Sequence, residues 1–495
     1  MSRDTIDFDD VQGLVRFGHG PLPEAVFVLA RVTSAAAARA WLRLAPVTTA
    51  ASTSSPPATA LQIAFTAQGL EALGVPLSVR AGFSSEFLEG MADANRARRL
   101  GDVGWNAPAQ WDWGHEATVP HVVVMLFAKP GQLGALVDRT CGEAWRDAFE
   151  ELRRLGTADL DGFEPFGFKD GISQPTVDWG QRRDPASGRH RYGNEVALGE
   201  FLLGYRNEYG KYTDRPLVGA DASTGGLPAA EDAPEKRDVG RNGTYMVMRQ
   251  LRQDVRGFWR HLAREAGGDE TAAEALAARL VGRTRGGDPL SHGHRTIPGV
   301  ADADAPRRNQ FTFDDDRAGV VCPVGAHIRR ANPRNGDYAY HETGVTRLFA
   351  DLGLPGSAFQ DDLVSAVRFH RILRRGREYG PSLAIAEALR PGPADDPERG
   401  LHFVCLNANI SRQFEFIQGA WLMSSTFAGL TGEGDSLLGH RQRIAGGGGT
   451  DRFTIQRDGL RRPVSGLPPF VRMRGGAYFF LPGLRALRFL AGASG

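Results

Sequence analysis

A single histidine, His327, stands in a segment whose residue types could bind an iron cofactor. The segment runs from Gly325 to Arg334 and also contains Arg329 and Arg330. Imidazole is the commonest protein ligand of haem iron. Arginines beside such a ligand could neutralise the carboxylates at the acidic edge of a porphyrin. A lone histidine is more often a surface or core residue, so this segment alone leaves both interpretations open.

A second segment, GFKDGISQP at 167–175, places Asp170 between two close glycines, Gly167 and Gly171. Glycine lacks a β-carbon and adopts backbone angles that other residues avoid. Such a turn can hold a carboxylate against a flat ligand, where the carboxylate could accept and return a proton. An ordinary Gly-Asp turn is the alternative interpretation.

A third segment is rich in arginine and contains Arg371, Arg374, Arg375 and Arg377. Arginine stays charged at any working pH and offers a fork of hydrogen-bond donors. One of these side chains could therefore stabilise negative charge that develops on a substrate oxygen. A solvated basic helix is the alternative, and it is a good explanation for three of the four arginines.

Together, the segments 167–175, 322–329 (CPVGAHIR) and 373–376 (LRRG) resemble the dye-decolourising (DyP-type) haem peroxidases. The resemblance extends over most of the chain, including 199–210 and 243–251. The chain length and long insertions resemble the larger subgroup of this family.

The resemblance implies a haem b cofactor, iron protoporphyrin IX, with His327 as its iron ligand. It implies that Asp170 and Arg374 are catalytic residues on the distal face of the haem, opposite His327. Glu415 matches the acidic residue that holds the other ring nitrogen of the ligand in related enzymes, a role typical of metal-bound histidines. The apolar residues around Glu415 suggest burial, although a solvated helix residue is the alternative.

The family also suggests further contacts to the cofactor. Leu401 and Phe403 alternate on an expected strand and would cover the distal pocket, although core packing is an equally good explanation. Arg334 is expected to reach a haem propionate, and Arg329 is a weaker candidate. Arg374 follows His327 at a longer distance than in compact members of the family, and an insertion at about 340–366 accounts for this.

The implied enzyme reduces hydrogen peroxide to water and oxidises aromatic or dye-like donors in one-electron steps through a ferryl intermediate. Large donors could not enter a pocket sized for peroxide, so their electrons would pass through surface tyrosines or tryptophans. One alternative is a haem-binding or haem-iron-handling protein without significant turnover, which needs His327 but neither Asp170 nor Arg374. Another is a structural α+β protein with a vestigial pocket.

Composition excludes several other classes. With 59 basic and 58 acidic residues, the net charge is +1, so no overall field favours nucleic acid or an anionic membrane. Cys141, Cys322 and Cys405 are far apart and form no CxxC pair, which argues against a zinc or iron–sulfur site and favours reduced thiols in the cytoplasm. Residues 1–13 lack a secretory pattern. No segment reaches the roughly 20 apolar residues of a membrane helix. The sequence leaves a homo-oligomer open.

Apolar runs that lead into helix-like segments predict an α+β fold. The resemblance implies that this α+β fold consists of two ferredoxin-like halves, each an antiparallel sheet with peripheral helices. Residues 1–220 would form the half that carries Asp170, and residues 221–495 the haem-binding half. The expected strands are 25–30, 61–65, 121–127, 245–249, 401–406 and 478–481. The expected helices are 34–45, 67–73, 130–155, 252–266, 410–423 and 483–491.

Overall fold

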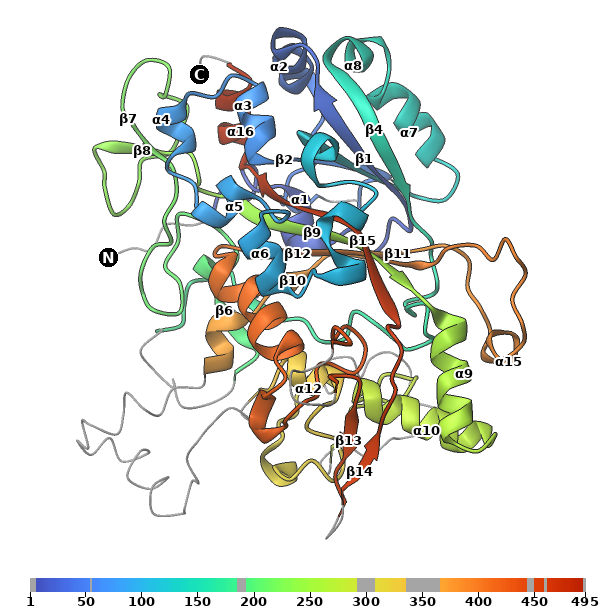
Figure 1. The fold of residues 1–495 in the computed structure, drawn as a ribbon. Coiled ribbons are helices and arrows are strands. Elements are labelled where there is room, and N and C mark those ends of the chain that lie inside the picture. The colour runs from blue at the N-terminus through green and yellow to red at the C-terminus, as the bar shows by residue number, and fades with distance from the viewer. Residues whose placement is uncertain are drawn as a thin grey trace, which may run out of the picture.

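One antiparallel sheet of nine strands forms the centre of the protein in the computed structural model (Figure 1). The structure describes residues 6–53, 56–184, 193–291, 308–334, 366–442, 449–457 and 461–492. The sheet has two parts, one from each half of the sequence, and small two-stranded sheets lie outside it.

The N-terminal part of the sheet has the strand order β2-β3-β1-β4. Its strands are β1 (Glu24–Val32), β2 (Thr59–Phe65), β3 (Val122–Ala128) and β4 (Phe149–Gly156). Figure 1 shows helices gathered beside β1 and β4, namely α2 (Ala35–Leu44), α7 (Leu133–Thr140) and α8 (Glu143–Ala148). The side chain of Ser34 caps α2 by accepting a hydrogen bond from the Ala37 N–H.

The C-terminal part repeats this arrangement in the order β15-β9-β12-β10, with β11 also paired to β12. Its strands are β9 (Thr244–Gln253), β10 (Leu373–Arg374), β11 (Arg377–Tyr379), β12 (Gly400–Asn407) and β15 (Val471–Leu481). In the N-terminal part, β1 lies between β3 and β4, and in the C-terminal part β9 lies between β12 and β15. Because β10 and β11 both pair with β12 and together take the place of one strand, this is the strand order of a ferredoxin-like fold. The α+β fold with two ferredoxin-like halves is thus confirmed.

The remaining helices lie around the sheet or in the loops. They are α1 (Gly13–Phe17), α3 (Ala67–Ala72), α4 (Leu77–Arg80), α5 (Ser85–Glu89), α6 (Ala94–Leu100), α9 (Val255–Glu265), α10 (Glu270–Val281), α12 (His327–Ala331), α15 (Ile385–Ala388) and α16 (Leu484–Leu490). Two π-helical segments run from Ser411 to Glu415 and from Ile417 to Met423. Within the described part of the chain, no helix is long and apolar enough to cross a membrane.

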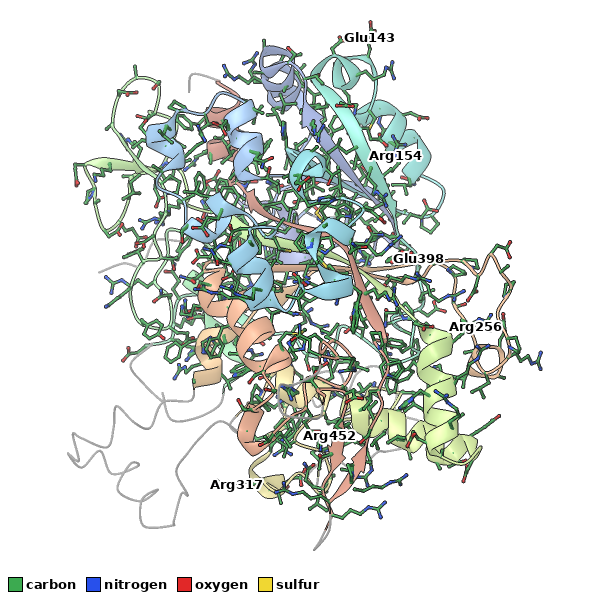
Figure 2. All side chains as sticks on the ribbon, in the orientation of Figure 1. Glu143, Arg154, Arg256, Arg317, Glu398 and Arg452 are labelled. Carbon is green, nitrogen blue, oxygen red and sulfur yellow. The ribbon has the colours of Figure 1, made fainter. Side chains whose placement is uncertain are left out.

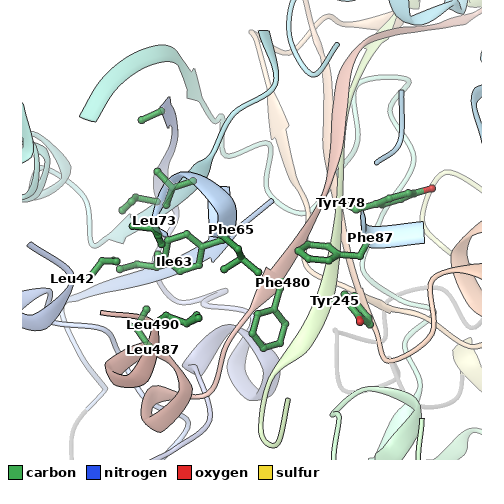
Figure 3. Packing of buried hydrophobic residues seen from close by; sticks show 14 of the residues in the cluster. Leu42, Ile63, Phe65, Leu73, Phe87, Tyr245, Tyr478, Phe480, Leu487 and Leu490 are labelled. Carbon is green, nitrogen blue, oxygen red and sulfur yellow. The ribbon is translucent and has the colours of Figure 1, made fainter. Parts of the chain in front are cut away.

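The two parts of the sheet meet where β15 pairs with β2 at Phe480 and Phe65. Both rings are fully buried, and Figure 3 shows them between the apolar side chains of the two halves. After β15 the chain continues into α16, whose Leu487 packs in the N-terminal core. The last strand therefore contributes to one hydrophobic core that residues of both halves share. Charged side chains such as Glu143 and Arg452 lie at opposite ends of the molecule (Figure 2).

Most of the expected elements are present, but the expected helix at 130–155 is wrong in its last third. Residues Phe149–Gly156 form β4, an edge strand that pairs only with β1. The proposed boundary at 220/221 falls between β7 (Leu217–Gly219) and β8 (Lys236–Asp238), which pair with each other, and it stays a prediction. Most of the expected insertion at 340–366 lies outside the described residues.

Candidate active site

A cavity of about 280 Å³ lies against one face of the C-terminal part of the sheet. Side chains at every second position of a strand share a face, and the lining shows this pattern. The lining residues from the sheet are Arg249, Leu251 and Gln253 of β9, Leu401 and Phe403 of β12, and Val471 and Met473 of β15. Loops and short helices close the cavity with further apolar side chains, among them Phe168, Ile172, Ile328, Phe414, Ile417 and Trp421.

His327 lines this cavity at the start of α12. Its Nδ1 lies 3.1 Å from both carboxylate oxygens of Asp435, which is completely buried. Burial alone would raise the pKa of Asp435, but the nearby charge and hydrogen bond of His327 lower it to about 2. The carboxylate therefore stays ionised and holds Nδ1 as a donor, which leaves Nε2 as the ring nitrogen that can bind a metal.

Glu415 does not hold His327, so this part of the sequence interpretation is wrong. Its carboxylate accepts hydrogen bonds at 3.0 and 3.1 Å from Arg96 Nη1 and at 2.9 Å from the Tyr478 hydroxyl. The π-helical segment that ends at Glu415 directs this side chain toward α6 and β15 and away from α12. The expected burial of Glu415 is confirmed, but its partner is an arginine of the N-terminal half.

The two carboxylates can be separated by experiment. Asp435→Asn should reduce haem affinity or peroxide reactivity about 10–100-fold, because His327 loses its anionic acceptor. Glu415→Gln should instead cost about 1–3 kcal/mol of stability, because Arg96 loses a charged partner in a buried site. Thermal unfolding and a haemin titration of both variants measure the two effects. The same loss of haem affinity in Glu415→Gln would contradict this assignment.

Asp170 and Arg374 form an ion pair in the wall of the same cavity. Arg374 Nη1 donates to Asp170 Oδ1 at 2.8 Å, and each side chain is about one-third exposed, at 29% and 33%. Burial alone would raise the pKa of Asp170, but the charge and hydrogen bond of Arg374 outweigh it, so the pKa lies below its ordinary value. Asp170 is thus a carboxylate with a fixed cation beside it.

The backbone around Asp170 needs glycine at two positions. Gly167 has a φ of 92° and Gly171 a φ of 76°, in the left-handed region that other residues avoid. Gln174 then joins this loop to β10, because its side-chain amide donates to the Arg374 carbonyl at 3.0 Å and accepts from the Arg374 N–H at 3.1 Å. This reciprocal pair fixes the two catalytic candidates relative to each other.

The cavity also holds a buried cation that the sequence interpretation did not identify. Arg283 is only 3% exposed, and it donates to the carbonyls of Gly287 and Arg308 and to the Ser173 hydroxyl. Burial, together with the charges of Arg334 and Arg374, lowers the pKa of Arg283 to about 9. An anionic ligand near Arg283 would relieve this electrostatic cost.

The other expected contacts are partly in place. Leu401 and Phe403 line the cavity, as expected. Arg334 does not line it, and its guanidinium donates to the Asn309 and Phe311 carbonyls at 2.7 and 2.9 Å. These described contacts contradict the expected role of Arg334 at a propionate. They direct its guanidinium to backbone carbonyls of the protein. Arg329 is buried against Asp316.

No protein-family model matches the chain, but individual relatives match over nearly all of it. The chain is 30% identical to the dye-decolorizing peroxidase msp1 of Mycetinis scorodonius, over 98% of this chain and 87% of that protein. It is 29% identical to the multifunctional dye peroxidase DyP2 of an Amycolatopsis species, over 87% of this chain and 82% of that protein.

Solved structures agree with this result. A crystal structure of the DyP-type peroxidase from Auricularia auricula-judae aligns with a TM-score of 0.72 and 25% identity, over 99% of this chain and 100% of that chain. A complex of a dye-decolorizing peroxidase with 2,6-dimethoxyphenol aligns with a TM-score of 0.70 at 24% identity. With 30% identity to a named peroxidase over almost its entire length, this chain belongs to the dye-decolorizing (DyP-type) peroxidase family, in its large subgroup.

Proposed function

We propose that the chain binds haem b through His327 Nε2 and uses it to reduce hydrogen peroxide while aromatic donors are oxidised. The observation that supports this most directly is the single cavity into which His327 and the Asp170–Arg374 pair both project. A protein that only carries haem needs a ligand histidine. It has no need for a carboxylate and a guanidinium paired at 2.8 Å in the same cavity.

The cavity fits an amphipathic, anionic cofactor. Its wall is largely apolar, but it also contains the ion pair of Arg249 and Asp102. The outer atoms of this pair, Arg249 Nη1 and Asp102 Oδ2, are buried without hydrogen-bond partners among the described residues. Arg283 adds a buried cation that carries no carboxylate partner within the described ranges. We assign Arg283, in place of Arg334, to the acidic edge of the haem, because Arg283 lines the cavity and Arg334 does not.

The protein side chains supply proton transfer and charge stabilisation. When bound, haem accepts two oxidising equivalents from peroxide and passes them on singly. Asp170 is ionised and can take a proton from one peroxide oxygen and return it to the other as water leaves. Arg374 stays protonated and stabilises negative charge on the departing oxygen. Asp435 keeps His327 oriented throughout.

Arg374→Leu should move the acid limb of the pH profile upward. Arg374 lowers the pKa of Asp170, so its removal leaves burial to raise that pKa above its wild-type position. The carboxylate base exists only above its pKa, so the variant should lose peroxide reactivity at a higher pH than the wild type. This shift of the acid limb is measured by following the rate of the peroxide reaction from pH 3 to pH 7. An unmoved acid limb would show that another group controls it.

The proposed function is tested by stopped-flow absorbance of haem-loaded protein mixed with one equivalent of hydrogen peroxide. A rapid change of the Soret band, followed by its return when a phenolic donor is added, supports a peroxidase. Stable haem binding without any reaction toward peroxide favours a haem-handling protein. No Soret band after addition of haemin favours a structural protein.

The class of donor and the location of the protein are further parts of the proposal. Because a related structure holds 2,6-dimethoxyphenol, we expect phenols and other aromatic compounds as donors. The three cysteines are unpaired thiols, which agrees with a cytoplasmic location. That location stays a prediction, and so does the oligomeric state.

A further inference from the structure

Glu164 is a second carboxylate in the wall of the cavity, in the loop that also carries Asp170. Its Oε2 accepts a hydrogen bond from the Phe166 N–H at 3.0 Å, and its Oε1 accepts one from the Phe168 N–H at 2.9 Å. The Glu164 N–H in turn donates to the Phe168 carbonyl at 2.9 Å. These bonds close the turn that leads to Asp170, so one short piece of backbone fixes both carboxylates.

Gln253, the last residue of β9, holds the same carboxylate from the sheet. Its Nε2 donates to Glu164 Oε2 at 2.7 Å. Its Oε1 is buried and has no hydrogen-bond partner among the described residues, which is a costly arrangement for a polar atom. A half-turn of the amide exchanges its nitrogen and its oxygen. Gln253 can therefore donate to Glu164 when that group is ionised and accept from it when it is protonated.

The surroundings of the two carboxylates shift their pKa values in opposite directions. Asp170 has the guanidinium of Arg374 beside it, and its pKa lies below the ordinary value. The described partners of Glu164 are neutral N–H groups. Burial, with the negative charge of Asp170, raises the pKa of Glu164 to about 7, although the three hydrogen bonds offset part of this. Below neutral pH the loop thus carries one ionised and one protonated carboxyl group, which separates a base from an acid.

Other charged groups also surround this loop. Those that line the cavity or bond to the loop are Asp170 and Lys169 on the loop itself, Asp102, Arg249 on β9, Arg283 and Arg285 after α10, and Arg374 on β10. The strands β12 and β15 contribute apolar side chains to the lining, and α9 contributes Trp259, whose Nε1 donates to the Phe166 carbonyl at 3.1 Å. Of all these charges, that of Asp170 has the largest effect on the pKa of Glu164. The two carboxyl groups are therefore coupled to each other.

The proton balance of peroxide reduction requires an acid besides Asp170. Two electrons and two protons convert one hydrogen peroxide to two waters. Asp170 moves one of the peroxide's own protons from one oxygen to the other and is then ionised again, so it brings neither of the two additional protons into the cavity. Both must reach the second oxygen while the donors supply the electrons. A protonated carboxyl group in the same wall can supply them.

We propose that Glu164 is the proton donor for the second water and that it acts through Asp170. The proposal rests on the proposed function, since it concerns the half of that reaction in which donors are oxidised. In each one-electron step, the O–H bond of Glu164 breaks, and its proton passes to the Asp170 carboxylate and on to the second oxygen. Water then reprotonates Glu164, and the Gln253 amide turns with each change. After two steps, the second oxygen has gained two electrons from donors and two protons, and it leaves as water.

Sequential stopped-flow mixing separates the two halves of the reaction. Haem-loaded protein is mixed with one equivalent of hydrogen peroxide and then with a phenol, from pH 5 to pH 8. Glu164→Gln should keep the first rate within about threefold of the wild type but lower the second rate by about 10²-fold. The second rate of the wild type should fall as pH rises through neutrality. In Gln253→Leu this fall should move to higher pH, because the hydrogen bond from Gln253 lowers the pKa of Glu164. Glu274→Gln, an exposed carboxylate outside the cavity, is the matched control and should behave like the wild type.

Infrared spectroscopy of the same proteins gives a measurement that does not depend on turnover. The wild type should show a carbonyl band of a protonated carboxylic acid that disappears as pH rises through neutrality, and Glu164→Gln should lack this band. Identical carbonyl bands in the two proteins, or an equal loss of both rates in Glu164→Gln, would overturn the proposal. Failure of the proposed function is distinguishable, because the wild type would then not react with peroxide, whereas the band of Glu164 would still titrate.

Discussion

His327→Ala should lose the Soret band and all reaction with hydrogen peroxide. Nothing else in the described cavity offers an imidazole held by a buried carboxylate, as Asp435 holds His327 at 3.1 Å. Loss of the Asp435 partner alone is expected to cost about 10–100-fold, so loss of the ligand itself should weaken haem binding by more than about a hundredfold. Haemin titration followed at the Soret band measures the affinity, and stopped-flow absorbance measures the peroxide reaction.

A matched control separates loss of the ligand from loss of the fold. His115 is partly buried, bonds to the Trp111 carbonyl and does not line the cavity, so His115→Ala should keep haem binding and peroxide reactivity. Added imidazole should restore part of the Soret band in His327→Ala by occupying the space of the missing ring. Full absorbance and reactivity in His327→Ala would mean that another group binds the iron.

The central strands could be predicted because their sequences are apolar on both faces. All seven residues of β3 (Val122–Ala128) are buried, and a run of β-branched and aromatic residues in this position reads as a strand. The edge strand β4 could not be recognised, because its sequence FEELRRLG places charged side chains at half of its positions. Its only sheet neighbour is β1, so it needs fewer apolar contacts than an inner strand.

The catalytic candidates could be predicted where a local motif marks them. Asp170 lies between glycines with positive φ, and such glycines are visible in the sequence. Asp435 and Arg283 had no such signal. Asp435 is 108 positions from His327, in a loop segment, and only the tertiary structure brings the two together. For Glu415, apolar neighbours indicated burial correctly, but burial alone does not identify the partner of a charged group.

The positions that sequence reasoning misplaced share a physical cause. Arg334, Glu415 and Arg329 are all buried charged side chains, and each needs a partner or several carbonyls to offset desolvation. In each case, the partner is supplied by the protein: Asn309 and Phe311 for Arg334, Arg96 for Glu415, and Asp316 for Arg329. From the sequence alone, a charged residue whose partner lies within the protein cannot be distinguished from one that binds a ligand. Arg283 differs, because its described partners are neutral.

Asp170→Asn should slow the reaction with hydrogen peroxide by about 10²–10⁴-fold, the usual contribution of a positioned acid–base group. Asparagine has nearly the same shape, and its carbonyl oxygen can still accept the hydrogen bond from Arg374. The substitution therefore removes the proton acceptor without removing the side chain. Stopped-flow absorbance at several peroxide concentrations measures the second-order rate constant, and the Soret band at rest confirms that haem is bound.

The pH dependence makes this prediction specific to Asp170. Arg374 lowers the pKa of the carboxylate, so the wild type should keep its reactivity at acidic pH and lose it only below the ordinary aspartate range. Asp170→Asn should show no such acid limb, because no carboxylate remains there to be protonated. Asp161→Asn, an exposed position in the same loop, should behave like the wild type. A wild-type maximum above neutral pH, or an Asp170→Asn rate within about tenfold of the wild type, would remove Asp170 from proton transfer. Charge stabilisation by Arg374 would then have to account for the reaction.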